Sequence, residues 1–240
     1  MKQLTGEITY NCMKRTGESS EEHSVLLREH AMDIYADGEL YVSAVCTDEW
    51  LEEMVIGRLL CDGMIQSVDE VQALKISDDH SVVDVEIVEA AGFRGENLWD
   101  SEPSRNRIFW PDEWVFHMAD VMAAGMPLHE MTWSAHSCYL FEQGELLFSC
   151  EDISRHNAVD KVIGYAVKNS VNLSRCAVYS SGRVPVDMLD KIIVAGIPVL
   201  VSKGMPTVQA VELAKEAGVT LICGARRDQM RVFTDYRSVK

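Results

Sequence analysis

The chain has 240 residues, of which 47% are hydrophobic and 25% charged, so it can bury a substantial core; this composition disfavours disorder, collagen and coiled coil. Its formal net charge of −16 argues against non-specific binding to a nucleic acid polymer or to an anionic membrane. The longest apolar run, residues 192–201, is interrupted by Gly196 and Pro198, so no transmembrane helix is predicted.

Charged residues are distributed unevenly along the chain, and the spacing of the cysteines limits the chemistry they can support. The first 160 residues contain 32 Asp and Glu against 10 Lys and Arg, whereas the last 80 contain 6 against 12. This division predicts a local anion site in the C-terminal third; the alternative is that acidic faces only keep the protein soluble. The seven cysteines form no CxxC and no zinc-type spacing, and no secretory signal begins the chain. Free thiols, a cytoplasmic location and no metal are therefore expected.

The N-terminal portion is predicted to be rich in β-structure. Strands are predicted at residues 4–12, 23–46 (with a tight turn at Asp37-Gly38), 71–76 and 82–88. Thr47 or Asp48 is predicted to cap a helix that ends at Asp62-Gly63. Residues 90–110 are predicted to form a loop because they are charged and contain Gly, Ser and Pro.

The rest of the chain predicts an α/β core. Pro111 begins a helix that ends at Gly125, and residues 131–141 and 145–150 are typical of a hairpin. Further strands are predicted at 177–180, 198–202, 219–223 and 231–234, alternating with helices that begin near His156 and after Pro185 and Pro206. Such alternation indicates a parallel or mixed sheet with helices on its faces. The predicted organisation is a β-rich portion over 1–110 and an α/β core over 111–240, packed as one compact unit.

The densest polar run, residues 151–161, follows a strand and opens a helix. A helix start offers free N–H groups and a positive dipole end, which suit phosphate. The cations and the histidine of the run add charge and a group that titrates near neutral pH, and its carboxylates could bind donors on a base or a pterin. The alternative is an ordinary strand-to-helix turn with solvated charges. The candidate ligand-binding residues are Glu151, Asp152, Arg155, His156, Asn157, Asp160 and Lys161.

Two further strand ends, at residues 180–183 and 202–207, carry hydroxyls, glycine and one cation each. Open α/β sheets bind ligands at the carboxyl ends of their strands, although neither segment matches a phosphate-loop or dinucleotide fingerprint. A histidine on the strand near residue 136 is either structural or completes the same pocket, and an arginine near residue 226 could contact a phosphate. These segments add the candidates His136, Ser180, Ser181, Gly182, Arg183, Ser202, Thr207 and Arg226.

The run EDISRHNAVDKVIG at residues 151–164 resembles the signature E-D-V-G-R-H-N-A-x-D-K-x-I-G of the formate dehydrogenase accessory sulfurtransferase family. Ten of its fourteen positions match, and Ser154 stands where the family has Gly. Residues 47–65, 132–141 and 180–234 resemble further family segments in the same order. The chain is thereby identified as a divergent member of that family.

The resemblance implies a cytidine-deaminase-like α/β fold, a mixed sheet with helices on both faces and no zinc site. It also implies a homodimer and binding of the molybdenum cofactor, bis(molybdopterin guanine dinucleotide). Family members take sulfur from a cysteine desulfurase as a Cys persulfide and pass it to this cofactor before it enters formate dehydrogenase. Sulfur transfer, cofactor binding and these two partners are therefore expected from the resemblance.

One departure concerns the chemistry. The family's persulfide cysteines lie in a C-G-x-C-G loop, but the corresponding stretch, residues 92–110, contains no cysteine. A thiolate attacks and carries sulfane sulfur, so Cys138 or Cys150, beside the polar run, would have to act instead. Two alternatives stay open. One is a chaperone or regulator that binds the cofactor or a guanine nucleotide without sulfur chemistry. The other is a different enzyme with His156 or His136 as the acid–base group.

Overall fold

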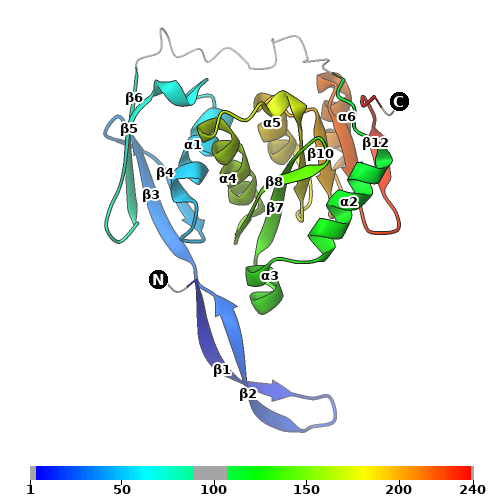
Figure 1. Ribbon diagram of the computed structural model, residues 1–240. Coiled ribbons are helices and arrows are strands. Elements are labelled where there is room, and N and C mark those ends of the chain that lie inside the picture. Colours follow the sequence, from blue (N-terminus) through cyan, green and yellow to red (C-terminus); the bar gives the residue numbers. More distant parts are fainter. Residues whose placement is uncertain (1–3, 89–106, 239–240) are drawn as a thin grey trace.

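A computed structural model describes residues 4–88 and 107–238 (Figure 1). The N-terminal portion contains a hairpin and a sheet. The hairpin projects from the body of the molecule and pairs β1 (Thr5–Met13) with β2 (Ser19–Leu27). The sheet has the strand order β4-β3-β6-β5, made of β3 (His30–Ala36), β4 (Glu39–Cys46), β5 (Val71–Ile76) and β6 (Val82–Ile87). One face of this sheet packs against α1 (Leu51–Cys61), and a short 3-10 turn (Val68–Glu70) precedes β5.

The C-terminal portion is built on a six-stranded mixed sheet with the order β12-β11-β10-β9-β7-β8. Its strands are β7 (His136–Glu142), β8 (Glu145–Asp152), β9 (Cys176–Ser180), β10 (Val199–Ser202), β11 (Thr220–Cys223) and β12 (Arg231–Thr234). Strands β9, β10 and β11 are parallel, β7 is antiparallel to β9, and β8 and β12 are antiparallel to β7 and β11. Strands β8, β9, β10 and β11 therefore all run in one direction, opposite to that of β7, which lies between β8 and β9.

Helices cover both faces of this sheet (Figure 1). On one face α2 (Asp112–Ala123) packs over Tyr139, Phe141 and Tyr179. On the other face lie α4 (Arg155–Lys168), α5 (Val186–Val194) and α6 (Val208–Ala217). The short α3 (Pro127–Thr132) leads into β7, and a 3-10 turn (Leu173–Arg175) leads into β9. Because helices cover both faces of the sheet, its strands are buried on both sides and are therefore mostly apolar.

A close crossing of α1 and α4 joins the two portions. A Cβ atom on Gly57 would clash with the backbone carbonyl of Asp160, and one on Gly164 would clash with that of Glu53. Since glycine alone fits at both positions, the helices approach backbone to backbone. This crossing brings the segment between β4 and α1 against the end of β8.

The mixed α/β class with helices on both faces and a β-rich N-terminal portion is confirmed. The predicted turn at Asp37-Gly38 is confirmed as well, because both residues have positive φ, 51° and 83°. Two local expectations are wrong. Residues 131–132 end α3 and are not strand. Neither Thr47 nor Asp48 caps α1; its N-cap is Trp50, in a left-handed conformation.

Most of the predicted loop over 90–110 lies outside the described residues, so the domain boundary near residue 110 stays a prediction. No helix of the described part is both long and apolar enough to cross a membrane.

Candidate functional site

Several strand ends meet at one edge of the six-stranded sheet. Because β8 to β11 run in one direction and β7 runs against them, the ends of those strands lie beside the start of β7. Backbone hydrogen bonds tie the following loops into one shelf: Lys203 N donates to Ser180 O (2.9 Å), and Ala225 N donates to Ser202 O (3.0 Å). We call this shelf, together with His136 and the start of α4, the strand-end edge.

Hydroxyl groups and glycines build the shelf. Ser202 is fully buried; its Oγ donates to Gly182 O (2.5 Å) and accepts from Gly204 N (2.9 Å). Ser180 Oγ accepts from Gly182 N (3.2 Å), and Thr207 Oγ1 accepts from Ala210 N at the start of α6 (3.2 Å). The hydroxyl contacts of Ser180, Ser202 and Thr207 are thus made inside the loops, and the ligand contacts of these residues stay a prediction.

The same edge gathers positive charge from three loops and one helix. Its cations are Arg155, Arg183, Lys203 and Arg226, and none has a carboxylate partner among the described residues. Arg155 packs against Gly182, where an added Cβ would lie 2.7 Å from Arg155 Cδ, and its Nε is buried without a hydrogen-bond partner. The guanidinium group of Arg226 donates to the carbonyls of Lys203 (2.6 Å) and Ala225 (2.8 Å). The edge is therefore a cationic region on an acidic protein.

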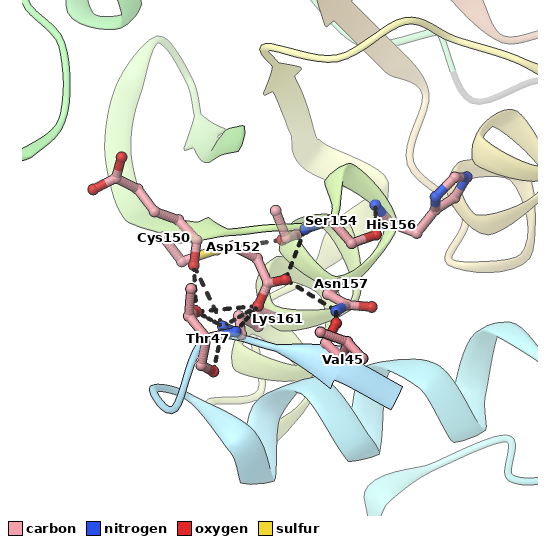
Figure 2. A network of polar contacts seen from close by, with 10 residues as sticks. Val45, Thr47, Cys150, Asp152, Ser154, His156, Asn157 and Lys161 are labelled. Atoms are coloured by element: carbon pink, nitrogen blue, oxygen red, sulfur yellow. Dashed lines mark hydrogen bonds and ion pairs between the residues drawn. The ribbon is translucent and has the colours of Figure 1, made fainter. Parts of the chain in front are cut away.

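Beneath this edge lies a buried polar network, shown in Figure 2. Lys161 Nζ lies 2.6 Å from Asp152 Oδ2, with both side chains fully buried, and donates to Thr47 Oγ1 (2.7 Å). The other oxygen, Asp152 Oδ1, accepts from Asn157 Nδ2 (2.9 Å) and from Ser154 N (2.9 Å). The network connects β8 and α4 with the segment that leads from β4 to α1.

Two further acidic residues of the run are also engaged inside the protein. Asp160 is buried and pairs with Lys191 (2.6 Å), and burial raises the pKa of Asp160 to about 6. Glu151 accepts from Leu128 N (2.8 Å) and His129 N (2.6 Å), so it caps α3.

These contacts engage five of the candidate residues inside the protein. All five are buried, and buried charges require partners, so direct ligand contact by these residues stays a prediction. The five residues are Glu151, Asp152, Asn157, Asp160 and Lys161.

The two predicted histidines keep partly exposed side chains at the edge. His136 Nδ1 lies 3.1 Å from Ser181 Oγ, and burial, followed by the charges of Arg155 and His129, lowers the pKa of His136. His156 Nε2 lies 3.0 Å from Asp187 Oδ2; burial is the first cause of its lowered pKa and the charge of Arg155 the second. An acid–base role for either histidine stays a prediction.

His129 was missed by the sequence analysis. It lies seven residues before His136 and donates from Nδ1 to Ala135 O, at 2.7 Å. Its charge is close enough to lower the pKa of His136. The spacing of the two histidines, with six residues between them, was the one feature of the sequence that relates them. The helix that carries His129 was not predicted, because a strand was expected to begin at residue 131.

The surroundings of the thiols raise their pKa values. Cys138 and Cys150 are cross-strand neighbours on β7 and β8, both are buried, and burial raises the pKa of each well above that of a free thiol. Burial likewise raises the pKa of the thiols of Cys46, Cys61, Cys176 and Cys223. In Cys12, on the projecting hairpin, the charge of Glu22 raises the pKa. All seven cysteines therefore favour the protonated form, which is the poor nucleophile.

In the described ranges, no group of three or more His, Cys, Asp or Glu side chains could hold a metal ion.

The sequence profile of the FdhD/NarQ family matches residues 27–100 and 92–240 of the chain. The protein belongs to the FdhD/NarQ family. Protein FdhD of Methanocaldococcus jannaschii is 30% identical over 210 residues, which cover 87% of this chain and 88% of that protein. Sulfur carrier protein FdhD of Geobacillus kaustophilus is 29% identical over 245 residues, covering 92% of each.

One solved structure agrees with this assignment. One described as that of a formate dehydrogenase accessory protein from Desulfotalea psychrophila has a TM-score of 0.85 and 25% identity, covering 97% of this chain and 98% of that chain. A guanine deaminase from Nitrosomonas europaea matches 51% of this chain with a TM-score of 0.33 and 17% identity, too low to support any inference. The family resemblance is thus confirmed over residues 27–240, and the mixed α/β fold over 97% of the chain.

Proposed function

We propose that this protein is a formate dehydrogenase accessory protein that binds the molybdenum cofactor, bis(molybdopterin guanine dinucleotide), at the strand-end edge. The observation that carries the proposal is the group of four cations there, which lack carboxylate partners among the described residues, in a chain of net charge −16. Pyrophosphate groups of the cofactor are anions that such a group attracts, and charge-assisted hydrogen bonds are the strong ones. Formate dehydrogenase is the partner, and a homodimer in the cytoplasm is part of the same proposal.

The network beneath the edge supports this role indirectly. Asp152 and Lys161 fix the end of β8 and the start of α4, and that start carries Arg155. Arg155 is then held against Gly182, so a cation of the helix lies beside the loop after β9. A site whose charged groups are held by buried neighbours binds an anion with little reorganisation.

Sulfur transfer is the second candidate function, favoured by the name sulfur carrier protein that several relatives bear. A carrier must form a persulfide on a thiolate, with a cysteine desulfurase as donor. Six of the seven thiols are buried, and in all seven the environment raises the pKa. The proposal therefore gives this chain the cofactor-binding role without a persulfide of its own.

The binding proposal is tested by calorimetry with guanosine diphosphate as a fragment of the cofactor. Replacing Arg155 by Ala is expected to weaken binding about tenfold or more, because one charge-assisted hydrogen bond is worth roughly 1.5–3 kcal/mol. Arg175→Ala is the matched control; Arg175 lies at the other end of β9, in a surface pair with Glu142. Equal affinities in wild type and R155A, or no binding to the wild type, would contradict the proposal.

The sulfur question is decided by intact-protein mass after incubation with a cysteine desulfurase and free cysteine. No reducible gain of one sulfur is expected, because the surroundings raise the pKa of every thiol in the chain. A relative that contains the C-G-x-C-G loop, labelled in parallel, shows that the donor is active. A reducible gain on a single cysteine, located by peptide mapping, would show that the chain carries sulfur and would contradict the absence of a persulfide of its own.

A further inference from the structure

A pocket lies at the end of the six-stranded sheet that is opposite the strand-end edge. Glu142, the last residue of β7, pairs with Cys176, the first residue of β9, so the loops beside this pair are remote from His136 and Ser180. The pocket has a volume of about 220 Å³, smaller than the roughly 300–1,000 Å³ of pockets that hold drug-sized molecules, so it suits one or two rings. The residues that line it are Ile108, Phe109, Trp110, Trp114, Gln143 and Arg175.

Backbone contacts hold the walls of this pocket in place. Trp110 N donates to Ser238 O (2.9 Å), and Ser238 N donates to Ile108 O (2.8 Å), so the segment before α2 is fixed to the C-terminal part of the chain. The ring of Trp114 lies against the turn between β7 and β8, where a Cβ on Gly144 would come within 2.8 Å of Trp114 Cδ2. The pocket is therefore built by contacts that exist without a ligand.

Three aromatic rings determine the surface that a ligand meets. The ring of Trp114 stands nearly perpendicular to those of Phe109 and Trp110, at 86° in both pairs, with centroids 5.4 and 5.1 Å apart. Phe109 is 50% exposed and Trp110 is 1% exposed, so Phe109 lies toward solvent and Trp110 lies toward the core. Rings arranged in this way offer a planar ligand both stacked and edge-to-face contacts.

The indole of Trp110 carries an unused donor. Its Nε1–H group is buried and has no hydrogen-bond partner among the residues that the structure describes. An indole N–H can only donate, and a buried donor without an acceptor costs free energy. Because buried polar groups in folded proteins are nearly always paired, this donor needs an acceptor, and a ligand oxygen beside Trp110 supplies one.

Arg175 is the charged residue of the pocket wall. Its Nε atom lies 3.2 Å from Glu142 Oε1, so the two side chains together contribute no net charge. An anion would compete with Glu142 for the guanidinium group, and a cation would be repelled by it. The pocket therefore favours an uncharged ligand.

We propose that this pocket binds a small, planar, uncharged ring that carries a carbonyl oxygen. The ring packs among Phe109, Trp110 and Trp114, and the oxygen accepts from Trp110 Nε1–H. A carbonyl suits this position better than a hydroxyl, because a hydroxyl proton would need an acceptor of its own. The site is separate from the strand-end edge and does not depend on the function proposed for that edge.

Binding is tested with three probes. 1-Indanone has the proposed ring and carbonyl, indane has the same bicyclic skeleton without oxygen, and benzoate is an anion. Proton–nitrogen spectra of the 15N-labelled full chain report the indole N–H signals, and the Trp110 signal is assigned from W110F. We expect 1-indanone to move this signal downfield with a Kd on the order of 1 mM or lower, and indane to move it less.

Trp110→Phe keeps an aromatic ring and removes the N–H group. The affinity for 1-indanone relative to that for indane should fall about fivefold or more, because only 1-indanone uses this donor. Trp133→Phe is the matched control, since Trp133 is 81% exposed at the end of α3, and it should leave the ratio unchanged. Phe109→Ala, at an exposed ring, should weaken the binding of both probes, whereas Arg155→Ala should change neither.

Four results would overturn the proposal. Without a saturable shift of the Trp110 signal by 1-indanone, this donor is left to solvent. An equal loss for 1-indanone and indane in W110F would mean that the pocket accepts apolar rings without using the N–H group. Tighter binding of benzoate than of 1-indanone would assign the pocket to an anion. Unchanged affinities in F109A would place both probes elsewhere, and this result does not depend on the folding of W110F.

Discussion

Lys161 and Asp152 form a fully buried ion pair, and the cost of that burial decides what a substitution does. The carboxylate is held by Lys161, by Asn157 and by the backbone N–H groups of Thr47 and Ser154. A charge in such a site is tolerated only while its partners remain.

Replacing Lys161 by Met leaves the Asp152 charge buried without its cation. The expected loss in the free energy of unfolding is about 3–5 kcal/mol, measured by urea denaturation. Lys75→Met is the control, since Lys75 is exposed and its pair with Glu86 is worth at most about 1 kcal/mol. A loss in K161M as small as that in K75M would show that the pair contributes little to stability.

Among single residues, the resemblance of the run 151–161 to the family signature could be read from the sequence. Which of its side chains point into the protein could not. A signal was present: Asn157, Asp160, Lys161 and Gly164 follow the spacing i, i+3, i+4, i+7 of one helix face. That face packs against α1, as Gly164 shows, so its polar members are buried. Arg155 and His156 precede it and stay partly exposed.

The secondary-structure elements themselves were largely predictable, because the apolar strands and the Pro and Gly boundaries are local signals. Helices after Pro111, Pro185 and Pro206 and the stop at Gly218, whose φ is 71°, are all confirmed. α3 was not predicted, since a helix of six residues has too few turns to show periodicity. Its N–H groups are satisfied by Glu151, more than twenty residues further along, and such a cap cannot be read locally.

The left-handed N-cap of α1 has a similar non-local cause. Thr47 has the side chain of a capping residue, yet its hydroxyl accepts from Lys161 and lies 3.1 Å from Asp152. The tertiary partner therefore overrides the local preference.

Which strand ends meet could be predicted once the sheet was taken as parallel, because parallel strands end at the same edge.

At the scale of the whole molecule, the α1–α4 crossing connects the four-stranded sheet to the six-stranded one. The cores on either side are separate clusters, one around Met32, Ile34 and Leu59 and the other around Val159, Val162 and Ile163. The two helices approach closely only because Gly57 and Gly164 lack a Cβ. Cooperative unfolding of the two portions therefore depends on this contact.

Replacing Gly164 by Ala places a methyl group against the backbone carbonyl of Glu53, which cannot move without shifting α1. Overpacking of this kind costs about 1–3 kcal/mol, and we expect that loss despite a gain of up to about 1 kcal/mol in helix propensity. Urea unfolding of the wild type should show one transition, whereas in G164A the N-terminal portion should unfold first and broaden or split it. Gly6→Ala is the matched control, because the nearest neighbour there is the end of the flexible Arg28 side chain. A single, unshifted transition in G164A would show that the two portions are joined by other contacts.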